Sequence, residues 1–147
     1  MSRTLYDQDF YLWTQREAGL LRSGDAKEAD LAHIAEELED LGRRDRHGME
    51  SRVRVLLMHL LKWMHQPERR EGSTWLSTII SQRRELELLL RDSPSLRHLL
   101  ECDTTLYEEA YRKARKDASR ETTLPLSNFR ECRPFTVDQI LDEDFLP

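Results

Sequence analysis

The chain has 147 residues, of which 38% are hydrophobic and 35% are charged. This length is sufficient for a single domain spanning residues 1–147, and the abundance of Leu, Ala, Glu and Arg favours helices over sheets. The net charge of -5 argues against a general nucleic-acid coat. No stretch approaches the roughly 18 uninterrupted apolar residues of a membrane helix, so we expect a cytoplasmic protein without a membrane partner.

Two helices are expected in the first third of the chain. Asp7 is a candidate N-cap for the first, which covers residues 10–24 and ends at Gly24. The second covers residues 28–42, where Leu31, Ile34, Ala35, Leu38 and Leu41 lie on one helical stripe. Gly42 either closes this helix or bends it, and residues 43–52 form either a turn or an exposed stretch of a longer helix.

Three further helices are expected after these. The third runs from Met49 to about Gln66, where Pro67 stops it. Ser73 is a candidate cap for the fourth, over residues 74–92. The pair Ser93-Pro94 begins the fifth, which continues through residue 118 with alanines at every fourth position, a spacing that allows a neighbouring helix to approach closely.

The chain after residue 121 is irregular and contains prolines, and Thr136 with Gln139 forms a candidate capping box for a last short helix. Strand-like alternation is absent. We therefore expect an all-α fold, a helical bundle of four to five main helices with an extended C-terminal tail packed on it.

Cysteine usage and histidine spacing both argue against a metal. Cys102 and Cys132 form no CxxC pair, so we expect neither a disulfide framework nor a zinc site, and no cofactor. At about 100° per residue, His59 and His65 point about 120° apart on the third helix and do not form an HxxxH-type site. A di-metal centre would need repeated Glu-x-x-His pairs, and the nearest match, residues 30 to 33, occurs once.

A buried polar cluster is the main candidate site. On the fourth helix Arg83 falls inside the apolar arc, where a guanidinium must find a carboxylate or a set of carbonyls. Our hypothesis is that Arg83 pairs with Glu37 and that His59 or Lys62 completes the cluster. The alternative is a local pair between Arg83 and Glu87. A group of Glu37, His59, Lys62 and Arg83 would suit acid-base chemistry on an anionic substrate.

Charge is uneven along the chain. Residues 25–40 hold seven acids and one base, whereas residues 43–70 hold eight bases and three acids. The arginines of the segment 43–54 could line a groove for phosphates. The surrounding acids would repel a polyanion. The sequence therefore favours an ion-paired surface over a nucleic-acid-binding one.

Several segments together resemble the bacterial family called domain of unknown function 29. The resemblance covers the chain from about residue 6 to residue 147, and its most specific stretch is "EELEDLG…LLMHLLKW…QPER". It implies a compact, all-helical cytoplasmic protein and implies no activity. The positions that match the family pattern are Asp9, Trp13, Asp30, Glu36, Glu37, His59, Lys62, Gln66, Pro67, Trp75, Gln82, Arg83 and Glu121.

This chain departs from that pattern in two places. Thr123 stands where the family usually has a glycine near the end of the fifth helix, and Arg133 precedes Pro134 where the family usually has a cysteine.

Three functions remain open from the sequence. The first is a non-enzymatic interaction or adaptor module that binds another protein or a second copy of itself. The second is a small enzyme acting on an anionic substrate through the Glu37, His59, Lys62 and Arg83 group. The third is a nucleic-acid-associated protein that uses the arginine-rich segment.

Overall fold

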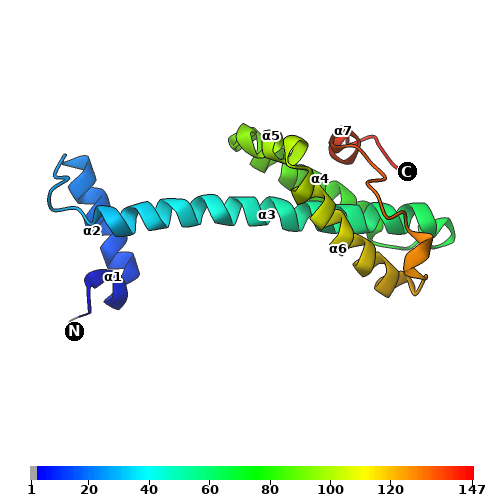
Figure 1. Cartoon of the computed structure of the whole chain (residues 1–147), viewed down its shortest axis with the longest axis horizontal. Coiled ribbons are helices and arrows are strands. Elements are labelled where there is room, and N and C mark those ends of the chain that lie inside the picture. Colours follow the sequence, from blue (N-terminus) through cyan, green and yellow to red (C-terminus); the bar gives the residue numbers. More distant parts are fainter. Residues whose placement is uncertain (1–2) are drawn as a thin grey trace. The chain divides into compact units, whose positions relative to one another are not determined.

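A computed structural model describes residues 3–147, and over these residues the chain contains helices and no strand, which confirms the all-α prediction (Figure 1). The α-helices are α1 (Leu5–Gln8), α2 (Phe10–Arg22), α3 (Leu31–His65), α4 (Trp75–Asp92), α5 (Pro94–Cys102), α6 (Thr104–Thr122) and α7 (Val137–Leu141). Two short 3-10 helices, η1 (Pro67–Arg69) and η2 (Leu126–Asn128), lie between them.

The chain forms two compact units. The first extends to Arg44 and the second runs from Asp45 to Pro147, so the boundary falls within α3. The expectation of a single domain over residues 1–147 stays a prediction.

The course of α3 shows whether Gly42 ends a helix or lies inside one. The helix runs without interruption from Leu31 to His65, so Gly42 lies inside it and residues 43–52 belong to one long helix rather than a turn. Residues 43–47 of this segment are exposed, whereas Met49 is fully buried. Glycine is unfavourable in a helix interior by about 1 kcal/mol relative to alanine. The remainder of the segment contains good helix formers and no proline, and this composition allows the helix to continue.

The first unit contains α1, α2 and the first part of α3. Thr4 and Asp7 form a capping box that begins α1, and Asp9 begins α2 by accepting from the Leu12 amide at 3.0 Å. The prediction that Asp7 caps the helix over residues 10–24 is therefore wrong, because Asp9 does so. Gly24 follows the end of α2 with a φ of 76°, the left-handed conformation that glycine adopts at little cost.

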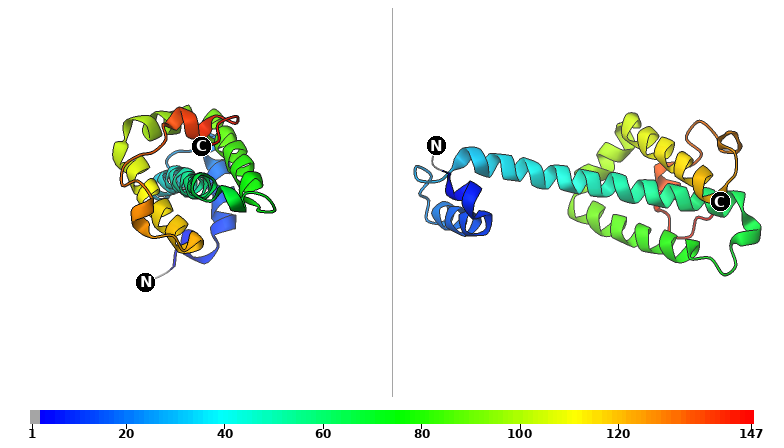
Figure 2. Two further views of the ribbon diagram at one scale, coloured as in Figure 1. Left: turned by 90° about the vertical axis from the view of Figure 1, so that its right-hand side faces the viewer. Right: turned by 90° about the horizontal axis from the view of Figure 1, so that it is seen from below.

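The second unit is built around the C-terminal half of α3. Figure 2 (left panel) shows α3 end-on, with α4, α6 and α7 around it. Most apolar residues of this part of α3 are buried, and those with no exposed surface include Val53, Leu56, Leu57, Leu60 and Leu61. Ile79 and Leu86 of α4 and Ala114 and Ala118 of α6 belong to the same core. The alanines of α6 are buried or nearly so, in agreement with the close approach that their spacing indicates.

The expected fifth helix is two helices. It begins at Pro94 as predicted, but α5 ends at Cys102 and α6 begins at Thr104. Asp103 separates them, and its carboxylate accepts from the Leu106 amide at 3.3 Å, which makes it the N-cap of α6. At α4, Thr74 rather than Ser73 occupies the N-cap position, while the Ser73 hydroxyl accepts from the Trp75 amide at 3.4 Å.

The C-terminal tail packs on the second unit, as predicted. The Tyr107 and Tyr111 hydroxyls of α6 donate to the carbonyls of Phe135 at 2.7 Å and Arg130 at 2.5 Å. Phe129, Phe135 and Ile140 of the tail are buried in the core. The predicted capping box of Thr136 and Gln139 is present and begins α7.

The position of Gly42 generates a test of the continuous helix. A Cβ added at Gly42 would contact nothing within 4 Å, so Gly42→Ala should stabilise α3 by about 1 kcal/mol. Gly24→Ala is the control, because a side chain at a φ of 76° should cost about 1 kcal/mol instead. Denaturation followed by far-UV circular dichroism measures both. An unchanged or lower stability of Gly42→Ala would contradict a helical conformation at this residue.

Candidate functional site

The four residues of the predicted cluster do not share one set of contacts. Glu37 lies in the first unit, on α3, whereas His59, Lys62 and Arg83 lie in the second unit. The Glu37 carboxylate accepts from the Tyr6 hydroxyl at 2.5 Å. This hydrogen bond, with the negative charge of Glu37, raises the pKa of Tyr6 to about 12. Glu37 thus holds α1 against α3 within the first unit.

Arg83 is buried, as the helical projection predicts, but its partners are backbone carbonyls. Its side chain is 5% exposed, and its Nε donates to the Ile140 carbonyl at 2.8 Å. Its Nη2 donates to the carbonyls of Phe145 at 2.8 Å and Gln139 at 3.5 Å. The hypothesis of an Arg83–Glu37 pair and the alternative of an Arg83–Glu87 pair are both corrected. The hydrogen bonds of the guanidinium thus hold the C-terminal segment against α4.

Burial lowers the pKa of Arg83, and the charge of Asp142 acts in the opposite direction. The three carbonyls supply the hydrogen-bond acceptors that a buried guanidinium requires. The sequence shows the inward position of Arg83 but not these acceptors, because every residue offers a carbonyl and only the path of the tail selects which ones meet Arg83.

Lys62 forms an ion pair that the sequence did not predict. Its ammonium group contacts the Glu121 carboxylate of α6 and lies 5.5 Å from the centre of the Trp75 ring. Lys62 is buried, whereas the Glu121 side chain is half exposed. The resemblance described under the sequence analysis includes both Glu121 and Trp75, but helix spacing alone does not indicate that they meet. The ion pair joins α3 to α6 beneath the ring from α4.

His59 lies one helical turn from Lys62 and is also buried. Its Nδ1 donates to the Val55 carbonyl at 2.8 Å, so in the neutral ring the free lone pair is on Nε2. Burial lowers the pKa of His59, and the positive charge of Lys62 adds to this effect. His59, Lys62 and Gln66 follow one another along α3 and its end, and we call them the polar line. The buried Oε1 of Gln66 has no hydrogen-bond partner within residues 3–147.

His65 lies apart from this polar line, as its position on the helix predicts. Its ring meets Phe129 edge-on, with centroids 4.7 Å apart, and burial lowers its pKa. Over residues 3–147 no group of three or more His, Cys, Asp or Glu side chains is arranged to hold a metal.

A second polar cluster lies in the first unit, around Asp30 at the beginning of α3. Asp30 Oδ2 contacts His33 Nδ1 at 2.6 Å and accepts from the Trp13 indole at 3.4 Å. The Asp30 amide donates to the buried Glu17 carboxylate at 2.8 Å, and the Tyr6 ring stacks on His33 at 4.0 Å. The contact between Asp30 and His33 lowers the pKa of Asp30 and raises that of His33. These groups satisfy one another and join α1 and α2 to α3.

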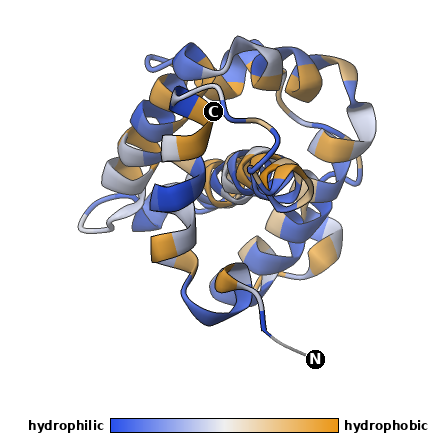
Figure 3. Cartoon of the chain, turned by 90° about the vertical axis from the view of Figure 1, so that its left-hand side faces the viewer, coloured by the Kyte–Doolittle hydropathy of each residue, from blue (hydrophilic) through white to orange (hydrophobic). Residues whose placement is uncertain are grey.

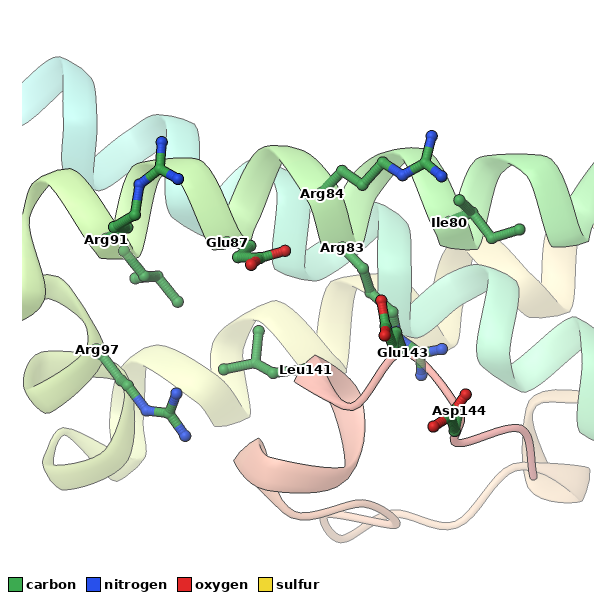
Figure 4. A pocket seen from close by; sticks show the side chains of 10 residues that line it. Ile80, Arg83, Arg84, Glu87, Arg91, Arg97, Leu141, Glu143 and Asp144 are labelled. Atoms are coloured by element: carbon green, nitrogen blue, oxygen red, sulfur yellow. The ribbon is translucent and has the colours of Figure 1, made fainter.

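A cleft of about 720 Å³ lies between α4, α5 and the C-terminal segment (Figure 4). Figure 4 shows Arg83 extending from α4 toward the segment that carries Glu143 and Asp144. The lining residues are Ile80, Arg83, Arg84, Glu87, Leu90, Arg91, Arg97, Leu141, Glu143 and Asp144. Four guanidinium groups and three carboxylates share this space, so the cleft shows no strong preference for one sign of ligand charge.

The arginine-rich segment is largely ion-paired. Arg43 pairs with Asp40 in the first unit, and the pairs Arg46–Glu50, Arg52–Glu85 and Arg54–Asp117 lie in the second. Arg44 makes no ion pair within residues 3–147. Neutralised arginines attract phosphates weakly, so the ion-paired surface that the sequence favours is the arrangement found here.

The most exposed apolar residues of α3 lie in the first unit. We call Leu31, Leu38 and Leu41, together with the partly buried Ile34 between them, the α3 stripe. Leu38 is 64% exposed, and Leu31 and Leu41 are each 54% exposed. Figure 3 colours the helices by hydropathy and shows apolar segments between polar ones along the chain. In the described part of the first unit, Trp13 is the only large apolar side chain that is buried.

The bonds of Arg83 predict a large effect of its removal. Arg83→Met keeps the volume of the side chain but leaves the carbonyls of Ile140 and Phe145 without their donor, so it should destabilise the second unit by about 2–4 kcal/mol. Arg84→Met is the matched control, since Arg84 is exposed and should change stability by less than about 0.5 kcal/mol. Chemical denaturation measures both variants. Equal denaturation midpoints for Arg83→Met and Arg84→Met would contradict this role of Arg83.

The two polar clusters predict opposite histidine titrations. By NMR, His59 should titrate below the ordinary value of 6.5 and His33 above it. As the pH falls below 6.5, His59 takes up a proton more readily in the unfolded chain than in the folded one, because burial lowers its pKa. The second unit therefore loses stability as the pH falls. His33 stabilises the first unit at low pH, and this contribution disappears as the pH rises through its raised pKa. His59→Gln and His33→Gln assign the two signals, and a reversed order of midpoints would refute the assignment.

Comparison with known proteins identifies the family. No curated protein and no solved structure matches this chain. None of the helices in residues 3–147 has the length and apolarity needed to cross a membrane. The family described as "Domain of unknown function DUF29" matches residues 5–146, nearly the whole chain. The chain therefore belongs to the DUF29 family.

Proposed function

We propose that this protein is a protein-interaction module and that the α3 stripe is its docking surface. The observation that carries the proposal is the exposure of Leu31, Leu38 and Leu41 on one side of a regular helix. Contiguous exposed apolar surface of this kind marks interaction sites in soluble proteins. A partner helix that lays an apolar face along the stripe is the occupant that suits this shape.

The energetics support a modest, reversible contact. Fully burying a leucine contributes about 1.5–3 kcal/mol, and each of these leucines still exposes about half of its surface, so covering one contributes about 1 kcal/mol. Association must also offset the lost freedom of two molecules. The stripe alone therefore supports a weak interaction, which further contacts of the partner would strengthen.

The contacts of the candidate cluster favour this function over an enzyme. Arg83 uses its guanidinium on carbonyls of the tail, and Glu37 binds Tyr6. Neither arrangement leaves these groups directed at a common substrate. The ion pairs of Arg46, Arg52 and Arg54 likewise give no support to a nucleic-acid-binding role.

The test is a comparison of two leucine variants. Leu38→Gln removes apolar surface from the centre of the stripe, whereas Leu88→Gln makes the same change at a leucine of α4 that is also exposed. In affinity capture from the native lysate, Leu38→Gln should lose bound partner by about tenfold, a change of about 1.4 kcal/mol, and Leu88→Gln should not. Equal capture by the two variants would overturn the proposal.

A further inference from the structure

We infer that the partner of the α3 stripe is a second copy of this chain, paired with it in antiparallel orientation. The inference rests on the proposed function and names its partner. It is carried by three features of α3 within residues 31–44: the spacing of the apolar residues, the order of the charges and the position of two small residues.

The spacing of the α3 stripe is that of a coiled-coil seam. Leu31 and Leu38 are seven residues apart, as are Ile34 and Leu41, and the two pairs are offset by three residues. In heptad terms they occupy the a and d positions. The neighbouring face of α3, which carries Asp30, His33 and Glu37, is the one that α1 and α2 contact. The contacts of α1 and α2 therefore lie along one flank of the seam, and Leu31, Leu38 and Leu41 on the seam itself stay more than half exposed.

The order of the charges selects the orientation. Four acids precede the end of the stripe, at positions 36, 37, 39 and 40, and two arginines follow it, at positions 43 and 44. Of these charges, only Glu37 and Arg44 flank the seam, each one residue before an a position. A parallel pair in register would set Glu37 beside the partner's Gly42, where it meets no opposite charge. An antiparallel pair can set Glu37 beside the partner's Arg44, which is a complementary contact.

One register satisfies both the apolar and the charged positions. With Leu38 opposite the partner's Leu41, the flanking position of Glu37 faces the partner's Arg44. Tyr6 occupies Oε1 of Glu37, and Arg44 has no ion-pair partner within residues 3–147, so both groups have bonding capacity for this contact. On the other flank Ala35 faces the partner's Gly42. A Cβ at Gly42 would meet open space, so the helices can approach closely there.

The register also limits the strength of the dimer. The central leucine layers are fully apolar, but Ile34 falls opposite Asp45 of the partner subunit. Short apolar seams of this kind give weak association, so we expect a dimer in the micromolar range that dissociates on dilution.

Disulfide trapping tests the orientation. In a Cys102→Ser, Cys132→Ser background, which removes the two exposed native thiols, a mixture of Leu38→Cys and Leu41→Cys chains should form a crosslinked dimer on mild oxidation. Leu38→Cys alone should crosslink poorly, because antiparallel helices separate the two copies of residue 38. Efficient crosslinking of Leu38→Cys to itself would show a parallel pair and overturn the inference.

Light scattering across a concentration series tests the partner. The unmodified chain should show a reversible monomer-dimer equilibrium, and Arg44→Glu should weaken it by about tenfold or more because it places an acid opposite Glu37. Arg43→Glu is the matched control, since it makes the same charge change one residue away, off the seam. A chain that stays monomeric at every concentration would overturn self-pairing, whereas loss of lysate capture by Leu38→Gln would still support docking of another protein. Equal effects of Arg44→Glu and Arg43→Glu would overturn the proposed register.

Discussion

The burial of the C-terminal half of α3 is the constraint on which the second unit depends. Helices and tail surround this segment, so each polar side chain on it needs a partner inside the protein. Lys62 finds Glu121, and His59 finds the carbonyl of Val55. The first of these bonds connects α3 to α6, and the second lies within α3. Together they place a line of polar groups in an otherwise apolar core. The hydrogen bonds and the ion pair of the polar line are therefore primarily what the burial of this helix requires of its polar side chains.

Arg83 supplies hydrogen-bond donors to buried carbonyls of the C-terminal tail. Residues after α6 have little regular structure, so their carbonyls lack helical partners. One guanidinium offers several donors in a fixed plane and can satisfy carbonyls from two places in the tail at once. A buried charge that is costly by itself thereby orders a segment with few other constraints. The tyrosine hydroxyls of α6 likewise satisfy two further carbonyls of the tail.

Sequence patterns predict this structure well where one helix face determines the outcome. The central position of α3, the inward position of Arg83, the divergence of His59 and His65, and the capping box at Thr136 all follow from local periodicity or local hydrogen bonds. The patterns fail where the outcome depends on contacts distant in the chain. Asp103 splits the expected fifth helix although the apolar pattern continues across it, and Arg83 meets carbonyls of residues more than fifty positions away.

The α3 stripe shows a further limit of the sequence. Periodicity reveals an apolar face but not whether that face is covered, because a leucine that packs in a core and one that awaits a partner follow the same spacing. The inner leucines of α3 are completely buried, whereas Leu38 on the same helix is largely exposed. Only the paths of the other helices distinguish these two situations.

The end of α6 illustrates how neighbouring residues can hold a left-handed turn that contains no glycine. Thr123 has a φ of 61°, a left-handed conformation that costs a residue with a side chain about 1–2 kcal/mol. Its neighbours hold the turn: the Ser119 hydroxyl donates to the Leu124 carbonyl at 2.7 Å, and the Leu124 amide donates to the Thr122 hydroxyl at 3.3 Å. These hydrogen bonds fix the shape of the turn, so the turn forms without a glycine at this position.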